Sequence, residues 1–460
     1  MNKRRLLWLA LALFFQVLAA HGVAPLILLS PGLLGLGLWA LPARTAIPSA
    51  LCWGLLFSAT FHFWALQSGV SFWVPLTLVR GLPWLFFVLP MLAAHAYKEE
   101  NPYLRALSVG TGLALTSQAL LATPAGFDWE LPAATLTAWP WTLTLLPWLG
   151  LSGTSFLLGS LSALLLQANK ASVGAGLALL GLWLSANSLL SSPAQECPVS
   201  VALLQPGWSE QQKWDPRYVE VSKNLLFLMS RDGEAADLIV WPETAWPVKG
   251  LGEVEQDRRA ISNLARNLRT DILAASIEVE PGGWRNTVWL VEASGQFFDR
   301  YDKQRLVPFG EHIPLPLSGK SLLQSIKPRS PEDRNYLASD NTRVFQNGDF
   351  RYSPLICFDS MVPWPSEKVA EQVDFLVVVT NDASLKSDFP KEAHFRSAIL
   401  RALQFRLPIV QASNNGVTGI IDSAGYVTAR TEPTLTGPQL LLYRGPGLGA
   451  ELRNAGYLNP

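Results

Sequence analysis

Long apolar runs dominate the first 195 residues, and polar residues interrupt them only briefly. Only 12 of the 72 charged side chains lie in residues 1–195, whereas the other 60 lie in residues 196–460. A helix needs about 20 mostly apolar residues to cross a bilayer. Membrane-spanning helices are therefore predicted over residues 6–22, 25–42, 46–66, 72–96, 105–122, 148–167 and 172–191. We expect a membrane bundle over 1–195 and a soluble domain over 196–460.

Positive charges indicate how this bundle is oriented. In a seven-span arrangement most of them fall on one side, which the positive-inside rule identifies as cytoplasmic. These residues are Lys3, Arg4, Arg5, Arg44, Lys98, Arg105 and Lys170. The N-terminus is thus expected in the cytoplasm. Residues 196–460 are expected outside the inner membrane, in the periplasm of a Gram-negative cell. Because further apolar runs follow the first helix, we expect that helix to be retained rather than cleaved.

Arg80, in VRGLPWLFF, is the exception to this charge pattern because it lies inside a predicted span. A charge at membrane depth is costly and is treated first as a functional candidate. The alternative is that the long side chain extends to the outer interface.

The second half of the chain alternates short β-branched runs with helical patterns. The predicted strands lie within 197–206, 236–243, 271–280, 286–293, 352–358, 374–382, 407–415 and 417–425. EVEQDRRAISNLARNLR and KEAHFRSAILRALQFR each place apolar residues three and four positions apart, which predicts amphipathic helices. This alternation favours a layered α/β domain.

Composition excludes several classes of function. The formal net charge is zero and no basic domain stands out, so we expect no nucleic-acid partner. No glycine-rich phosphate loop follows any predicted strand, which leaves nucleotide binding without support. Cys52, Cys197 and Cys357 form neither a disulfide framework nor a zinc pattern, although a Cys197–Cys357 disulfide stays open.

Three chemically distinct residues follow or end predicted strands. Glu243 ends ADLIVWPE, Lys303 lies in YDKQRLVPFGEHIP just after a hairpin, and Cys357 lies near the end of YSPLICF. Reactive groups gather at the carboxyl ends of strands in α/β sheets. A carboxylate can accept a thiol proton, and a lysine can lower the thiol pKa and stabilise an oxyanion. Each residue also has a structural explanation, as a turn cap, a surface charge or a core residue, and both interpretations stay open.

The motifs WPETAWP, YDKQRLVPFGEHIP and LICFD appear in the order Glu, Lys, Cys. Together they resemble the nitrilase superfamily, whose members carry a Glu-Lys-Cys triad on an α-β-β-α sandwich. With LLQPGWSEQQKWDP, RGLPW and the apolar N-terminal half, the chain is similar to the apolipoprotein N-acyltransferase family within that superfamily.

This resemblance implies specific roles at matching positions. Cys357 would be the nucleophile, Glu243 the general base and Lys303 the cation that stabilises the oxyanion. Glu311 matches a second glutamate that supports the lysine. The implied substrate-binding residues are Trp214 on a loop over the site, Phe358 and Asp359 after the nucleophile, and Asn286, which like Asn381 matches a structural asparagine.

The resemblance also implies a reaction, with no metal and no cofactor. A monomeric inner-membrane enzyme would move the sn-1 acyl chain of a phospholipid, such as phosphatidylethanolamine, onto Cys357 as a thioester. The α-amine of a diacylglyceryl-cysteine at a lipoprotein N-terminus would then accept it. Two alternatives are a membrane-anchored nitrilase-like amidase and a non-catalytic lipoprotein-binding relative.

Several positions depart from the family pattern. Phe358 replaces the usual Tyr, Asp359 the usual Glu, Ser384 the usual Trp, and Gln404 the usual Glu. The family usually ends in another transmembrane helix, whereas this chain ends in LLLYRGPGLGAELRNAGYLNP. Either this member lacks that helix or the chain was trimmed. We expect these differences to affect recognition of the acyl chain and the lipoprotein.

Overall fold

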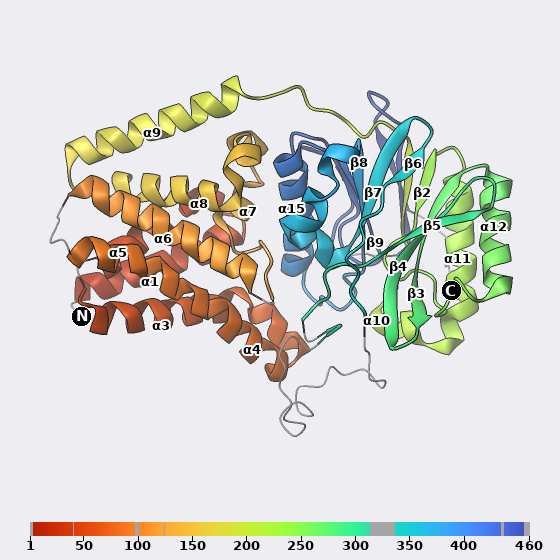
Figure 1. Cartoon of the computed structure of the whole chain (residues 1–460), viewed down its shortest axis with the longest axis horizontal. Helices are drawn as coiled ribbons and strands as arrows, with labels where there is room; N and C mark the ends of the chain where they lie inside the picture. Colours follow the sequence, from red (N-terminus) through yellow and green to blue (C-terminus); the bar gives the residue numbers. More distant parts are fainter. Residues whose placement is uncertain are drawn as a thin grey trace. The chain divides into compact units, whose positions relative to one another are not determined.

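The computed structural model describes residues 3–39, 41–96, 101–123, 125–308, 310–312, 336–433 and 437–454. They form two compact units, one ending at Ser192 and the other beginning at Pro193. The described part of the first unit contains helices only, whereas the second contains two β-sheets with helices (Figure 1). The predicted fold class, a helical apolar part followed by an α/β domain, is therefore confirmed.

Every predicted membrane span overlaps a helix of the first unit. The helices are α1 (Lys3–Ala20), η1 (Ala24–Leu28), α2 (Ser30–Leu38), α3 (Ala43–Phe61), η2 (Phe63–Ser68), α4 (Val70–Gly81), η3 (Leu82–Trp84), α5 (Leu85–Ala96), α6 (Pro102–Ala122), α7 (Pro132–Leu136), η4 (Pro140–Leu143), α8 (Leu146–Leu165) and α9 (Lys170–Leu189). Within the described residues, three stretches are long and apolar enough to cross a membrane: Val70–His95, Leu146–Leu165 and Lys170–Leu189. Seven crossings stay a prediction.

Arg80 lies at the last turn of α4 and is fully buried in the helical unit. Its guanidinium donates to the carbonyl oxygens of Leu120, Ala125 and Phe127 at 2.8–3.1 Å. It also forms an ion pair with Glu130 at 2.5 Å. Arg80 thus binds the segment that follows α6, and its side chain does not extend to the surface of the unit.

Two sheets form the centre of the second unit. The first sheet has the order β13-β12-β1-β2-β3-β4-β5 and the second has the order β11-β10-β9-β8-β7-β6. The strands are β1 (Val201–Gln205), β2 (Leu238–Val240), β3 (Asp271–Glu280), β4 (Gly283–Val291), β5 (Phe297–Asp302), β6 (Phe345–Asn347), β7 (Phe350–Ile356), β8 (Phe375–Thr380), β9 (Ile409–Ser413), β10 (Gly419–Ile421), β11 (Val427–Arg430), β12 (Gln439–Tyr443) and β13 (Ala450–Asn454). Each of the eight predicted strand ranges overlaps an observed strand.

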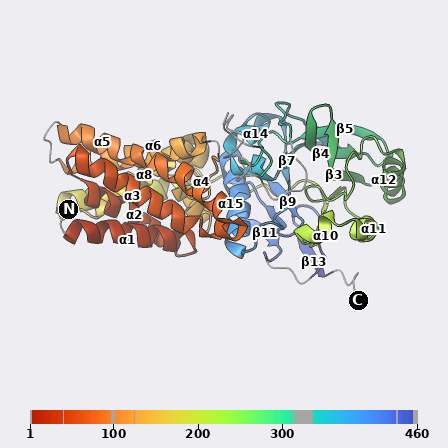
Figure 2. The same ribbon diagram turned by 90° about the horizontal axis from the view of Figure 1, so that it is seen from below.

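Alternating side chains divide this unit into layers. In β1, Val201 and Leu203 join the core between the two sheets, whereas Ala202 and Leu204 join a second core with α11 (Val219–Asp232) and α12 (Glu255–Leu268). The period of two along a strand produces this division. The other sheet packs against α15 (Asp388–Phe405), as Figures 1 and 2 show. The result is the predicted α-β-β-α sandwich.

Strand direction places the polar residues at related edges. β2 and β3 are parallel, and two antiparallel steps through β4 give β5 the same direction. β7 and β8 are parallel in the other sheet. Glu243 and Lys303 therefore follow the carboxyl ends of strands in one sheet, and Cys357 follows such an end in the other.

Candidate functional site

Glu243 is a buried carboxylate held by three donors. Its Oε1 accepts from Asn286 Nδ2 at 2.6 Å and from Lys303 Nζ at 3.2 Å. Its Oε2 accepts from the backbone N–H of Asn381 at 2.8 Å. The turn after β2 is constrained as well, because Thr244 has a φ of 49°, which L-residues rarely adopt. The contacts fix the carboxylate's orientation from both sheets.

Lys303 follows β5 and is also buried. Its ammonium lies between Glu243 and Glu311, with the Glu311 Oε1 distance being 2.9 Å. Glu311 Oε2 accepts from the backbone N–H of Val307 at 2.8 Å. The backbone N–H of Lys303 donates to Asn286 O at 2.9 Å. The ammonium is therefore held between two carboxylates, both of which are anchored elsewhere.

Charge pairing decides the protonation of both groups. Burial alone would raise the pKa of Glu243, but the ammonium groups of Lys303 and Lys213 and the hydrogen bond from Asn286 lower that pKa below its usual value. Burial alone would lower the pKa of Lys303, but Glu243 and Glu311 hold it well above its usual value. At neutral pH the two residues form a carboxylate and an ammonium.

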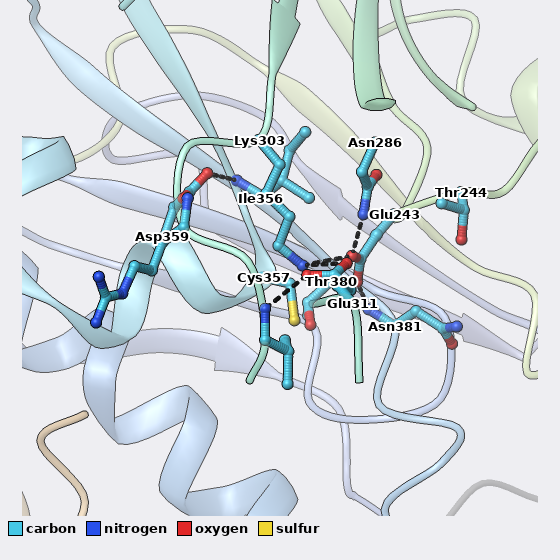
Figure 3. A network of polar contacts seen from close by, with 12 residues as sticks. Glu243, Thr244, Asn286, Lys303, Glu311, Ile356, Cys357, Asp359, Thr380 and Asn381 are labelled. Atoms are coloured by element: carbon cyan, nitrogen blue, oxygen red, sulfur yellow. Dashed lines mark hydrogen bonds and ion pairs between the residues drawn. The ribbon is translucent and has the colours of Figure 1, made fainter. Parts of the chain in front are cut away.

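Cys357 stands directly after β7, at the start of the short helix η6 (Cys357–Met361). Its φ of 50° is a strained conformation for a non-glycine residue. Cys357 is partly exposed and its thiol is free, as are the thiols of Cys52 and Cys197. The Cys197–Cys357 disulfide that the sequence allowed is therefore not formed. Figure 3 shows the sulfur of Cys357 beside Glu243, Lys303 and Glu311.

The resting thiol is protonated. Burial raises the pKa of Cys357 well above its usual value, and the carboxylates of Glu243, Asp382 and Glu311 raise it further. Lys303 lowers it, as the sequence predicted, but does not compensate for burial and these carboxylates. Attack by the sulfur therefore requires that its proton moves to a base, and Glu243 is the nearby carboxylate that three donors hold in place.

Phe358 and Asp359 are buried in η6. The Asp359 carboxylate accepts from Tyr301 Oη at 2.8 Å and from the backbone N–H groups of Arg305 at 2.6 Å and Ile356 at 3.2 Å. Burial raises the pKa of Asp359 to about 6, although Lys303 and these donors oppose the rise. Asp359 thus ties the segment after Lys303 to the nucleophile strand, a geometry that favours a positioning role over substrate contact.

Trp214 ends α10 (Glu210–Trp214) and lies outside the polar network around Glu243. Like Trp284, it packs against a small apolar cluster that includes Leu306, and its Nε1 donates to Glu210 at 3.0 Å. Its neighbour Lys213 is buried and donates to the carbonyl oxygen of Glu243 at 3.0 Å. Helix α10 is therefore connected to the site through Lys213.

Three side chains near the site were not predicted as functional. Lys213 stands beside the predicted Trp214, and Asp382 directly follows Asn381. The third, His394, lies among the apolar positions of α15 and is fully buried. The signal in the sequence was a histidine among the apolar positions of a predicted helix. The residues that His394 contacts are distant in sequence, so that signal did not indicate a role.

Comparison with known proteins adds sequence evidence. The carbon-nitrogen hydrolase family model matches residues 200–437. Apolipoprotein N-acyltransferase of Pseudomonas syringae pv. tomato is 29% identical over 453 residues, which cover 90% of this chain and 85% of that protein. The Brucella melitensis protein of the same name is 27% identical over 83% of this chain and 74% of its own length. The Geobacter metallireducens protein of that name is 32% identical, and the match spans 53% of this chain and 47% of that protein.

Solved structures also resemble part of the chain. Saccharomyces cerevisiae Nit3, a member of branch 10 of the nitrilase superfamily, has a TM-score of 0.42 at 15% identity and covers 55% of this chain and 91% of its own. A carbon-nitrogen hydrolase from Helicobacter pylori G27 has a TM-score of 0.40 at 15% identity, covering 52% and 87%.

Proposed function

We propose that this chain, which belongs to the carbon-nitrogen hydrolase family, is a phospholipid:apolipoprotein N-acyltransferase whose reaction runs through a thioester on Cys357. One observation carries this proposal: similarity to proteins named apolipoprotein N-acyltransferase extends over about 90% of the chain, including the helical unit. The buried Glu243–Lys303–Glu311 network beside a free thiol supports it.

In the first half-reaction, the Cys357 sulfur attacks the ester carbonyl carbon of the phospholipid acyl chain. The thiol proton passes to the Glu243 carboxylate as the S–C bond forms, because the raised pKa of the thiol opposes a free thiolate. Attack converts the carbonyl oxygen into an oxyanion. An ammonium has three N–H donors, and Lys303 gives two of them to Glu243 and Glu311.

The third donor of Lys303 is suited to the oxyanion. A pre-positioned cation in a water-poor site stabilises developing negative charge without reorganisation. Collapse of the tetrahedral intermediate breaks the ester C–O bond. The leaving lysophospholipid oxygen takes the proton from Glu243, and an acyl thioester remains on Cys357.

In the second half-reaction, the acceptor α-amine attacks the thioester carbonyl and Glu243 receives an amine proton. The C–S bond then breaks and the sulfur regains a proton. Asn286 Oδ1 is buried without a hydrogen-bond partner among the described residues. Since this amide already donates to Glu243, its oxygen is an acceptor available to an N–H of the amine, in line with a substrate-binding role.

We also propose an inner-membrane location with the catalytic unit on the periplasmic side. The donor is a membrane lipid and the acceptor carries two acyl chains, so a membrane-anchored enzyme meets both at one surface. The clustering of Lys and Arg described above supports a cytoplasmic N-terminus.

The test is transfer of a labelled acyl chain to purified protein. The full chain in detergent is incubated with a phospholipid labelled in its sn-1 chain, and the protein is then treated with neutral hydroxylamine, which cleaves thioesters. We expect a hydroxylamine-sensitive label on the wild type and none on Cys357→Ala. Addition of a diacylglyceryl peptide with a free α-amine should release the label into that peptide as an amide.

Three outcomes would count against the proposal. Folded wild-type protein without any adduct would exclude phospholipid as the acyl donor. Hydrolysis of a small amide in the same sample would instead indicate the amidase alternative. A label that persists on Cys357→Ala would show that another residue is the nucleophile.

A further inference from the structure

A buried Asp–His pair lies directly behind the nucleophile. His394, on α15, is 0% exposed, and its Nδ1 is 2.8 Å from Asp382 Oδ1. Its Nε2 is 3.3 Å from the backbone carbonyl oxygen of Cys357. We propose that His394 is a positioning residue for the thioester chemistry, held by Asp382 as an imidazolium that donates to the Cys357 carbonyl and balances the Asp382 charge.

The hydrogen-bond partners require two donors on this ring. A carboxylate accepts only, and so does a backbone carbonyl. The imidazole can satisfy both at once only if Nδ1 and Nε2 both carry hydrogen, which is the cationic form. The hydroxyls of Thr380 and Ser360 approach the two ring nitrogens at 3.4 Å, a weaker geometry than the 2.8 Å contact to Asp382.

Asp382 is itself fixed, so it can hold the ring. Its Oδ1 accepts from Thr380 Oγ1 at 3.2 Å and its Oδ2 accepts from Ser413 Oγ at 3.3 Å. Both hydroxyls stand at the ends of strands β8 and β9. The pair is therefore built into the sheet edge and does not depend on a surface loop.

Electrostatics agrees with this geometry. Burial alone would lower the pKa of His394, but the Asp382 charge, the bonds to Asp382 and the Cys357 carbonyl, and the Glu243 charge raise it above its usual value. Among the described residues, the ionisable groups whose charges act on the ring are Asp382 after β8 and Glu243 after β2. Both are carboxylates, and they favour the cation.

The consequence for Cys357 follows from its backbone. A φ of 50° costs a non-glycine residue free energy and persists only where the surroundings enforce it. Ser360 Oγ donates to the same Cys357 carbonyl at 2.9 Å, so two donors hold it. The imidazolium also balances the negative charge of Asp382, which otherwise raises the pKa of the Cys357 thiol. This inference rests on the proposed role of Cys357 as nucleophile.

The test uses alkylation of Cys357 by iodoacetamide across a range of pH, which needs no lipid. It is carried out on the full chain in detergent, in a Cys52→Ser background because Cys52 is exposed. His394→Phe removes both donors and the charge. We expect its alkylation profile to move to higher pH by about one unit, which is about a tenfold slower rate at neutral pH.

A neutral donor separates position from charge. His394→Gln can place its amide nitrogen near the Nε2 position and keep the bond to the Cys357 carbonyl without a charge. The alkylation profile of His394→Gln should also shift to higher pH. The double variant His394→Gln/Asp382→Asn should return toward the wild-type profile, because it no longer contains the unbalanced Asp382 carboxylate. His21→Gln, at an exposed position of the helical unit, is the matched control and should not shift.

An unchanged alkylation profile in folded His394→Gln would overturn the imidazolium role, even if His394→Phe fails to fold. Failure of the double variant to reverse the shift would also overturn it. The outcome is distinguishable from failure of the proposed function. If the alkylation profile of the variants shifts but the wild type forms no lipid adduct, acyl transfer is rejected and the role of His394 stands. If a lipid adduct forms but the profiles do not shift, acyl transfer stands and the role of His394 is rejected.

Discussion

The protonation state of each ionisable side chain in the site depends on the charges of its neighbours. Lys303 is an ammonium because two carboxylates flank it, and Glu243 is a carboxylate because the ammonium groups of Lys303 and Lys213 and the hydrogen bond from Asn286 lower its pKa. Cys357 stays a thiol because the nearby carboxylates and burial outweigh the single ammonium. Changing one charge must therefore move the pKa of its neighbours, and the thiol is the group that can be followed chemically.

Glu243→Gln should separate catalysis from thiol reactivity. Loss of the base is expected to reduce acyl transfer by about 10²- to 10⁴-fold. Loss of the negative charge removes a cause of the raised thiol pKa, so alkylation of Cys357 by iodoacetamide should become faster at pH 7. Both rates are measured on the same preparation. A parallel fall in alkylation would contradict the assigned electrostatics.

Lys303→Met should have the opposite effect on the thiol. Without the ammonium the pKa of Cys357 rises further, so both acyl transfer and alkylation should fall. The change also leaves Glu243 and Glu311 as unpaired buried carboxylates, which costs about 3–5 kcal/mol of stability. The melting temperature is therefore measured alongside, with Lys303→Met/Glu311→Gln as the variant expected to recover stability without activity.

Helix η6 owes its position to one carboxylate. Asp359 accepts hydrogen bonds from β5 through Tyr301, from the backbone beyond Lys303, and from β7 at Ile356. Cys357 and Lys303 follow strands of different sheets. The hydrogen bonds of Asp359 therefore connect the two segments that carry them. The cost of this connection is the burial of a charge.

The pH dependence of stability should report that cost. The folded-state pKa of Asp359 is raised from 3.8 to about 6, so the folded state binds a proton that the unfolded state has lost between these values. Stability from this group is present below pH 4 and is lost as pH rises through 6. A difference of about two pH units corresponds to about 3 kcal/mol. The free energy of unfolding of wild type relative to Asp359→Asn should fall by that amount from pH 4 to pH 7, and a constant difference would contradict it.

The helical unit contains a comparable connection at Arg80. This residue joins α4 to Glu130 and to carbonyl groups in the last turn of α6 and just after it, all of them buried. An ion pair of this kind stabilises only while both partners are present.

Arg80→Met should therefore lower the melting temperature in detergent strongly, by a loss of about 3–5 kcal/mol, because Glu130 is left as an unpaired buried charge. Arg80→Met/Glu130→Met should recover part of this loss, and the double-mutant cycle gives the coupling. Equal stability of the wild type and the single variant would show that the pair is not structural.

The whole chain combines an apolar unit with few charges and a second unit that holds most of them. If the first unit lies in a bilayer, lipid surrounds it, whereas water surrounds the second unit. The side on which the second unit lies is then decided by the number of crossings and by the positive residues of the first.

A reporter fused after the last residue tests this topology. Alkaline phosphatase, which needs an oxidising compartment to fold, should be active there, whereas a fluorescent protein that folds only in the cytoplasm should be dark. A control fusion after residue 101 should give the reverse result, because this position lies on the predicted cytoplasmic side. Cytoplasmic activity at the chain end would overturn the seven-span arrangement.

Local patterns were sufficient for part of the structure. Hydrophobic periodicity is a property of neighbouring residues, so the fold class of an apolar helical part with an α/β domain, the eight strand ranges and the helices α12 and α15 could be predicted. Strands β5, β6, β11, β12 and β13 and helix α11 were missed. Several of these strands lie at or near sheet edges, where side chains meet more solvent and alternate less clearly. The placement of Glu243 and Cys357 near strand ends was also readable, since each lies at or near the end of a predicted strand range, whereas β5, the strand that Lys303 follows, was not predicted.

Only the tertiary structure decided how these groups act on one another. The two sheets bring Glu243 within reach of Lys303, 60 residues away, and of the Asn381 backbone, 138 residues away. Lys213 and His394 looked ordinary in sequence because a charge or an imidazole acquires a role from its partners. The protonation of Cys357 depends on a sum of burial and charges from four segments, and no local pattern contains that sum. Sequence by itself determined which chemical groups are present, and packing decided their pKa values, because electrostatic interaction depends on distance in space.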